Sequence, residues 1–338
     1  MSQWTTHPIE KKLEARLKDE LGGAMGIEFY SYYVSARQYL LDNVFEEIKT
    51  KEPNLSDHGP KHIFDVLNRA YELAGPDLNK LKVMELYILC LSIQFHDVGN
   101  LEGRTKHNKN IARIYDAARN NDPKFATERN AVLAIAGAHT GLCNEGTKDT
   151  LKDLPDTTGV FSKPVRYKMI GGLLRFADEL AEGKQRTSRY MQDTGKYSDE
   201  SLPFHRLANV TDYTIDRDNK RIEANYQIYL EMDSDGNITD GKVPLLDLLD
   251  IITTRIIKVN EERVYCRYYS EVLSPFQEIS VAFTFVYDHE YLDAGIKPLK
   301  LNDLVVPGND KYDICAPGYS TTDLFEKITK AIASENEQ

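Results

Sequence analysis

Apolar side chains recur every three to four residues through much of the first half of the chain. In residues 9–21 an isoleucine and three leucines lie four residues apart, which is the spacing of one face of an amphipathic helix. Residues 27–49 mix aromatic and aliphatic side chains and predict another helix, followed by a turn-rich loop at 51–60. The same pattern predicts further helices at 61–74, 83–95, 108–119, 127–138 and 165–182.

The segment 83–95 differs from the others because it is apolar on nearly every side. This composition is typical of a helix that is buried all round. His96 and Asp97 follow directly, and Gly99-Asn100 then ends the helix. We therefore expect a His-Asp pair at the end of a helix in the middle of the first domain.

The pattern changes beyond about Arg189. Residues 220–232 and 278–287 are rich in β-branched and aromatic side chains and predict strands, with a hairpin-type turn at 233–237. Residues 245–265 carry an apolar stripe and predict a long helix, and Ser320-Thr-Thr-Asp323 resembles a capping box that opens a last helix. We expect an all-α domain over residues 1–190, then a smaller α+β domain with an antiparallel sheet over 191–338.

Composition supports a folded protein of about two domains. The chain has 338 residues, of which 41% are hydrophobic and 28% charged, which excludes a disordered or collagen-like chain. No apolar run reaches the roughly 18 residues of a membrane span, and residues 1–7 lack the pattern of a signal peptide, so we expect a cytoplasmic protein without membrane partners. The cysteines are too widely spaced for a disulfide framework or a zinc knuckle: Cys90, Cys143, Cys266 and Cys315.

The net charge bears on possible partners. The 42 basic and 53 acidic residues give 42 − 53 = −11 with histidine neutral. A protein that coats nucleic acid needs clustered Lys and Arg, so the acidic balance disfavours that role and leaves room only for a local basic pocket.

Histidines cluster in the first domain. Of the eight in the chain, five fall between residues 58 and 139: His58, His62, His96, His107 and His139. Downstream, Asp178 shares an apolar helix face with Leu174 and Ala181, where a carboxylate is costly unless it is paired or binds a metal. A salt bridge to a neighbouring helix is the alternative. On the solvated face of the same helix, Arg175 is expected to be exposed and to pair with Glu179 four residues later.

Three motifs together resemble the HD superfamily of metal-dependent phosphohydrolases. They are Asp57-His-Gly-Pro-Lys-His-Ile-Phe-Asp-Val66, Phe95-His-Asp-Val-Gly-Asn100 and Leu174-Arg-Phe-Ala-Asp-Glu179. The resemblance covers roughly residues 50–190 and implies an HD-type helical domain.

The resemblance also implies a ligand set. One divalent ion would be held by His62, His96, Asp97 and Asp178. His62 is preferred over His58 because Val66 follows it at the family's spacing. Relatives with two ions add two histidines in the region of His107 and His139, with Asp97 as the bridge. The chain lacks the paired features of the cyclic-dinucleotide phosphodiesterases, which argues against that substrate.

The activity that the resemblance implies is phosphate hydrolysis by metal-activated water, on a nucleotide or another small phosphorylated metabolite. Asp97, His58, Arg104 and Lys106 are the expected catalytic residues, and the ion is one or two of Mn, Mg, Co, Ni or Fe. The alternatives are a single-strand nuclease or phosphodiesterase, a nucleotide sensor that signals through the C-terminal domain, and a di-iron oxygenase. The role of residues 191–338 and the oligomeric state stay open.

Overall fold

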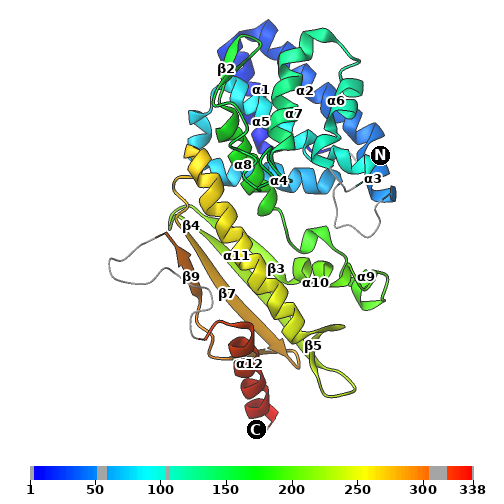
Figure 1. The fold of residues 1–338 in the computed structure, drawn as a ribbon, viewed down its shortest axis with the longest axis vertical. Coiled ribbons are helices and arrows are strands. Elements are labelled where there is room, and N and C mark those ends of the chain that lie inside the picture. The colour runs from blue at the N-terminus through cyan, green and yellow to red at the C-terminus, as the bar shows by residue number, and fades with distance from the viewer. Residues whose placement is uncertain (1–3, 52–58, 104–106, 304–317, 337–338) are drawn as a thin grey trace. The chain divides into compact units, whose positions relative to one another are not determined.

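The computed structural model of the chain describes residues 4–51, 59–103, 107–303 and 318–336. The chain divides into two compact units (Figure 1). We call them the helical unit, residues 1–181 with 265–274, and the sheet unit, residues 182–264 with 275–338. Each is described by itself below.

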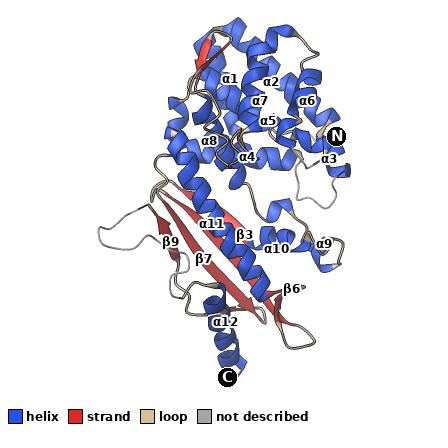
Figure 2. Ribbon diagram, in the orientation of Figure 1, coloured by secondary structure: helices blue, strands red, loops and turns tan. Residues whose placement is uncertain are grey.

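The helical unit is built almost entirely of helices (Figure 2). They are α1 (Pro8–Leu21), α2 (Gly23–Asn43), α3 (Phe45–Lys51), α4 (Pro60–Ala74), α5 (Val83–Phe95), α6 (Ile111–Ala118), α7 (Ala126–Gly137) and α8 (Tyr167–Glu179). Short 3₁₀ turns link several of them, among them η2 (Val98–Glu102) and η3 (His107–Lys109). The end of helix α11 (Leu245–Tyr269) and the turn η6 (Glu271–Leu273) complete the unit.

Helix α5 is the centre of this unit. All of its side chains are buried, as its continuous apolar sequence predicts. It packs against α1, α2, α4, α7 and α8. The residues that follow its last turn therefore emerge among several other helices, and this is where His96 and Asp97 lie.

Some boundaries in the helical unit differ from the prediction. The segment 27–49 is two helices, because the chain breaks at Val44 between α2 and α3. The stretch 108–119 begins as a 3₁₀ turn and becomes α-helical only at Ile111. A two-stranded hairpin, β1 (Thr158–Val160) and β2 (Lys163–Val165), interrupts the otherwise helical unit.

The sheet unit is the predicted α+β domain. Its helices are α9 (Arg189–Asp193), α10 (Leu202–Val210), most of α11 and α12 (Thr321–Asn336). Its strands are β3 (Thr211–Asp216), β4 (Arg221–Met232), β5 (Ile238–Asp240), β6 (Val243–Pro244), β7 (Glu278–Tyr287), β8 (Glu290–Leu292) and β9 (Leu299–Asn302). Ser320 and Asp323 form the predicted capping box of α12: Ser320 Oγ accepts from Asp323 N, and Asp323 Oδ2 accepts from Ser320 N.

The sheet departs from the prediction at its central pair. Strands β4 and β7 are parallel, with Arg221 opposite Glu278 and Leu230 opposite Tyr287, whereas the other described pairs are antiparallel. The reason is the connection between them. Helix α11 lies between β4 and β7 in the chain. It brings the chain back to the end of the sheet at which β4 begins, so that β7 can run in the same direction, as a crossover helix does between parallel strands.

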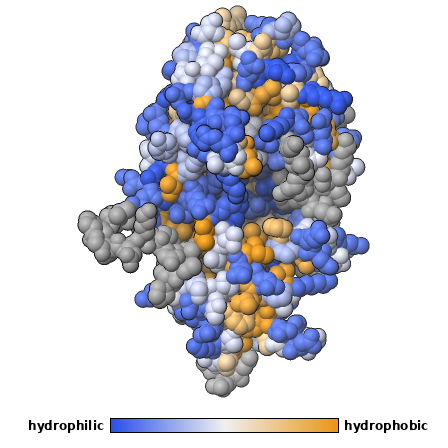
Figure 3. Space-filling model, in the orientation of Figure 1, coloured by the Kyte–Doolittle hydropathy of each residue, from blue (hydrophilic) through white to orange (hydrophobic). Residues whose placement is uncertain are grey.

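Helix α11 runs along the strands of this unit in Figure 1. Its predicted apolar stripe is buried: Leu245, Leu248, Leu249, Ile252, Ile256 and Val259. Alternate residues of β4 are buried as well, so one face of the sheet is apolar. In Figure 3 hydrophobic side chains also reach the surface over α11, and Leu246, Ile257 and Val264 are 45%, 37% and 43% exposed.

The helices of the described ranges differ from membrane-spanning segments. None of them combines the length and the apolar character needed to cross one.

Candidate metal centre

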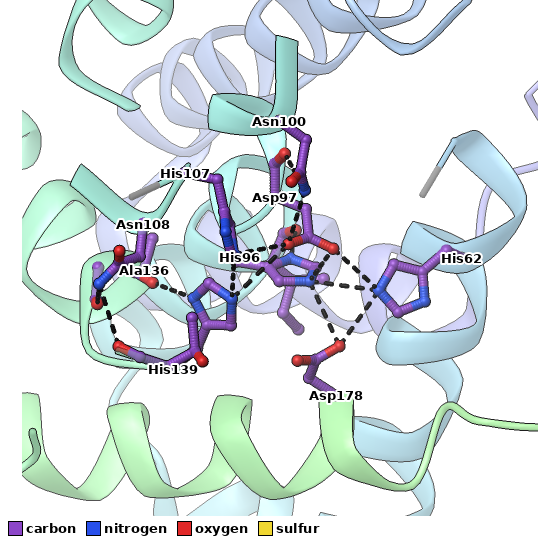
Figure 4. Close-up of polar contacts among 12 residues, drawn as sticks. His62, His96, Asp97, Asn100, His107, Asn108, Ala136, His139 and Asp178 are labelled. Atoms are coloured by element: carbon purple, nitrogen blue, oxygen red, sulfur yellow. Dashed lines mark hydrogen bonds and ion pairs between the residues drawn. The ribbon is translucent and has the colours of Figure 1, made fainter. Parts of the chain in front are cut away.

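Four of the predicted ligands come together in the helical unit from three different helices (Figure 4). His62 lies in the first turn of α4, which begins at Pro60 after the cap residue Gly59. His96 and Asp97 follow the end of α5, and Asp178 lies in the last turn of α8. The helices place all four side chains at one point because α4, α5 and α8 pack against one another.

The donor atoms of this first group are close enough to share one ion. His62 Nε2 lies 3.1 Å from Asp178 Oδ1 and 3.4 Å from Asp97 Oδ2, and His96 Nε2 lies 3.5 Å and 3.2 Å from the same atoms. Donors about 2.1 Å from a metal are separated by about 3.0 Å in octahedral and about 3.4 Å in tetrahedral geometry. Three of the four distances fall in this range and the fourth, 3.5 Å, lies just above it, so the donor set fits a divalent ion.

A second group lies beside the first and shares Asp97 with it. His107 Nε2 and His139 Nε2 are 3.4 Å apart, and they lie 3.5 Å and 3.6 Å from Asp97 Oδ1. The two oxygens of one carboxylate thus face different groups, Oδ2 the first and Oδ1 the second. Either group could hold a metal ion, with Asp97 between the two.

Two of the histidine rings are oriented in the same way. His96 Nδ1 lies 2.9 Å from the carbonyl of Ile93, and His139 Nδ1 lies 2.6 Å from the carbonyl of Ala136. In each case the ring donates its Nδ1 proton to the residue three positions earlier. With Nδ1 as the donor, Nε2 is the ring nitrogen that faces the centre, as in metal-binding histidines generally.

The side chains that orient the candidate ligands could not be recognised from their positions in the sequence. Asn100 Nδ2 donates to the Asp97 carbonyl at 3.0 Å and to Asp97 Oδ1 at 3.3 Å, and so orients the carboxylate that the two groups share. Asn108 Nδ2 donates to the carbonyls of Gly137 and Thr140, and so joins the turn of His107 to the turn of His139. Each asparagine lies within three residues of a predicted ligand, but this position alone does not distinguish such a role from that of a turn residue.

Gly99 has a different role from the one its sequence position suggests. The prediction treats it as a helix stop. In the structure a Cβ at this position would lie 1.9 Å from the carbonyl oxygen of His107. The missing side chain lets the backbone of η2 approach the backbone of η3, which brings His107 to Asp97.

The charges in the first group perturb one another. Burial by itself lowers the pKa of His96, but the carboxylates of Asp97 and Asp178 outweigh it and raise that pKa well above its usual value. Burial likewise raises the pKa of Asp178, and His96 and His62 outweigh it, so this pKa is well below its usual value. The metal-free cluster therefore favours an imidazolium-carboxylate arrangement, which a bound cation would replace.

The centre is buried on most sides. The side chains of His62 and His96 are 0% exposed and that of Asp97 is 6% exposed. Asp178 and His107 are more open, with 24% and 19% of their side chains exposed. Solvent and any ligand therefore reach the cluster at these two residues.

The remaining predicted residues have different outcomes. His58, Arg104 and Lys106 lie outside the described residues. Arg175 does not extend into solvent: it is 7% exposed and donates to the Lys148 carbonyl and to Thr150 Oγ1. The helical pattern predicted an exposed Arg175 because the loop that covers it, which contains Lys148 and Thr150, lies far from it in the sequence.

Comparison with known families agrees with this geometry. The HD-CE family model matches residues 52–235, which is more than half of the chain. The chain belongs to the HD-CE family. No curated protein and no solved structure matched it significantly. An HD-type domain is thus confirmed in this HD-CE protein, and it includes both histidine groups.

Proposed function

We propose that this HD-CE protein is a metal-dependent phosphohydrolase whose substrate is a nucleotide or another small phosphorylated metabolite. The observation that carries the proposal is the position of Asp97, whose two oxygens face two histidine groups at 3.2–3.6 Å. A pair of divalent ions held at such a centre would lower the pKa of a bound water and neutralise phosphoryl charge. Manganese is the ion we would test first, because mixed imidazole and carboxylate donors accept it.

The protein residues would hold the two ions and keep the donor atoms oriented toward them. His62, His96 and Asp178 complete the first group, and His107 and His139 the second. The Nδ1 hydrogen bonds of His96 and His139 keep the Nε2 atoms aimed inward, which reduces the reorganisation needed when a ligand binds.

A phosphorylated substrate would reach this centre at its open edge, between Asp178 and His107. The phosphate also needs cationic partners from the protein. We propose Arg104 and Lys106 for this role, because Lys106 directly precedes His107 in the chain, and His58 as a further substrate contact.

The test uses the purified full chain with Mn²⁺ and a panel of nucleoside mono-, di- and triphosphates, cyclic nucleotides and single-stranded nucleic acids. We expect phosphate release from a small nucleotide, and loss of that release in Asp97→Ala. Asp116→Ala is the matched control, because Asp116 pairs with Arg129 on the surface of α6 and lies outside both groups.

Other outcomes would point elsewhere. Strand cleavage without phosphate release from nucleotides would support a nuclease, and tight nucleotide binding without turnover would support a sensor. Oxygen consumption with bound iron would support an oxygenase. Full hydrolysis by Asp97→Ala would contradict the proposed centre itself.

A further inference from the structure

The loop that follows His139 is closed by a hydrogen bond at its two ends. Thr150 Oγ1 donates to the carbonyl of Ala138, the residue directly before His139. Thr150 is 6% exposed and Ala138 is 5% exposed, so water does not replace this contact. The backbone just before His139 is thus tied to a residue twelve positions after Ala138.

The same threonine is held from α8. Arg175 Nη1 donates to Thr150 Oγ1 at 2.9 Å and to the Lys148 carbonyl at 3.1 Å. Arg175 precedes Asp178 by three residues, so both lie on neighbouring positions of one helix surface. A continuous chain of hydrogen bonds therefore runs from the helix of Asp178 through Arg175 and Thr150 to the backbone of His139.

Two tyrosines at the end of α11 hold the other side of this loop. Tyr265 and Tyr269 donate to Asp149 Oδ1 at 2.9 Å and 3.0 Å, and the Tyr265 hydroxyl accepts from Leu151 N. The Arg175 guanidinium lies over the Tyr265 ring, 4.6 Å from its centroid. These contacts all belong to the helical unit and leave the loop 148–151 little freedom to move.

We propose that Thr150 and Arg175 are positioning residues of the second metal group. They hold His139 Nε2 at its distance of 3.6 Å from Asp97 Oδ1 while Asp178 serves the first group from the same helix as Arg175. This inference rests on the two-ion centre proposed above. It adds that binding of the second ion depends on the contacts of Thr150 and Arg175, which do not involve the ligands of the first group.

The test compares Thr150→Val with Thr150→Ser in the full chain. Valine keeps the shape but removes the hydroxyl, whereas serine keeps it. Mn²⁺ titration followed by the electron paramagnetic resonance of the free ion counts equivalents and resolves their affinities. In Thr150→Val we expect the second equivalent to bind at least about 10-fold more weakly, the usual effect of losing a group that orients a ligand. The first equivalent should bind as in the wild type.

Further variants separate positioning from general damage. Thr150→Ser should restore the affinity for the second equivalent. Arg175→Met should weaken the second equivalent in the same way, whereas Arg113→Met, whose side chain is 88% exposed, should change neither affinity. Backbone hydrogen exchange of residues 138–151 in the metal-free protein should rise in Thr150→Val.

Three results would overturn the inference. One is a Thr150→Val protein that binds both equivalents like the wild type. Another is equal weakening of both equivalents, which indicates general destabilisation. A wild-type protein that binds a single equivalent overturns the two-ion centre together with this inference, so the two failures can be told apart.

Discussion

Asp97 is the residue on which both histidine groups depend. Its Oδ2 lies within 3.4 Å of His62 and His96, and its Oδ1 lies within 3.6 Å of His107 and His139. Each histidine, by contrast, brings its Nε2 atom to one group. Removing Asp97 should therefore affect two ions, and removing one histidine should affect one.

Metal counting tests this difference. Asp97→Ala should retain less than one equivalent of Mn²⁺, while His139→Ala should retain about one, because the first group keeps its four donors. The rate of hydrolysis should fall at least about 100-fold in both variants. Loss of a residue that only orients a ligand costs up to about 100-fold, and loss of the ligand itself should cost at least as much. Elemental analysis after dialysis measures the equivalents. Two equivalents in His139→Ala would exclude this residue as a ligand.

The pH dependence of metal binding follows from His96. The carboxylates of Asp97 and Asp178 raise its pKa well above the usual value of 6.5, so without metal the ring keeps its proton to a higher pH than an ordinary histidine, and an ion must displace that proton. Protons therefore compete with Mn²⁺ for His96 already above pH 6.5. The apparent Mn²⁺ affinity should fall about tenfold for each pH unit by which the pH is lowered below this pKa. Titrations at pH 6, 7 and 8 measure it. Equal affinity at all three would contradict the displacement.

At the level of elements, the strength of the local pattern decided what could be predicted. Helix α5 has the predicted bounds because an apolar run with polar ends allows few alternatives. The parallel pairing of β4 and β7 could not be predicted, because strand composition carries no direction. Arg175 was placed outside because its partners, Lys148 and Thr150, come from a loop more than twenty residues earlier.

The two groups of candidate ligands were accessible to sequence reasoning for a related reason. Ligand side chains need particular chemistry, and scarce histidines next to helix ends stand out. Asn100 and Asn108 have no such mark, because an asparagine near a helix end usually serves as a cap or a turn residue. Their roles depend on backbone carbonyls that only the folded chain brings to them.

Three helices of the helical unit are joined by one buried carboxylate. Glu128 in the first turn of α7 is 0% exposed and accepts from Tyr87 of α5 and Tyr115 of α6, at 2.6 Å and 2.5 Å. It also pairs with the buried Arg119 just after α6. These contacts lie away from the histidine groups, so they stabilise the unit without touching the centre.

Replacing this carboxylate should lower stability. Glu128→Ala leaves the Arg119 guanidinium buried with its charge unpaired, which typically costs about 3–5 kcal/mol. We expect that loss in the free energy of unfolding, measured with urea on the metal-free full chain. The exposed Glu145→Ala, whose side chain is 69% exposed, is the control and should change stability little. An unchanged free energy in Glu128→Ala would show that Arg119 finds another partner.

At the level of the whole molecule, one helix belongs to both units. Helix α11 begins in the sheet unit at Leu245, and its last residues, from Tyr265, belong to the helical unit together with η6. Gly172 of α8 permits this packing, because a Cβ there would lie 3.0 Å from the carbonyl oxygen of Cys266. The change in sequence pattern favours a single boundary near residue 190. A helical domain that ends there would lack residues 265–274, which belong to the helical unit.

A chain ended after residue 190 tests how much the helical unit depends on residues 265–274. It would lose the buried Cys266, Val272 and Leu273, and Leu151 N would lose its tyrosine acceptor. Each missing apolar side chain removes roughly 1.5–3 kcal/mol of burial, and 1 kcal/mol shifts the melting temperature by about 2–4 °C in a unit of this size. We therefore expect the shortened chain to melt at least about 10 °C below the same chain joined through a flexible glycine-serine linker to residues 265–274. Equal melting temperatures would mean that the helical unit is complete without the segment, and that its contacts with α8 and the loop 148–151 contribute nothing to stability.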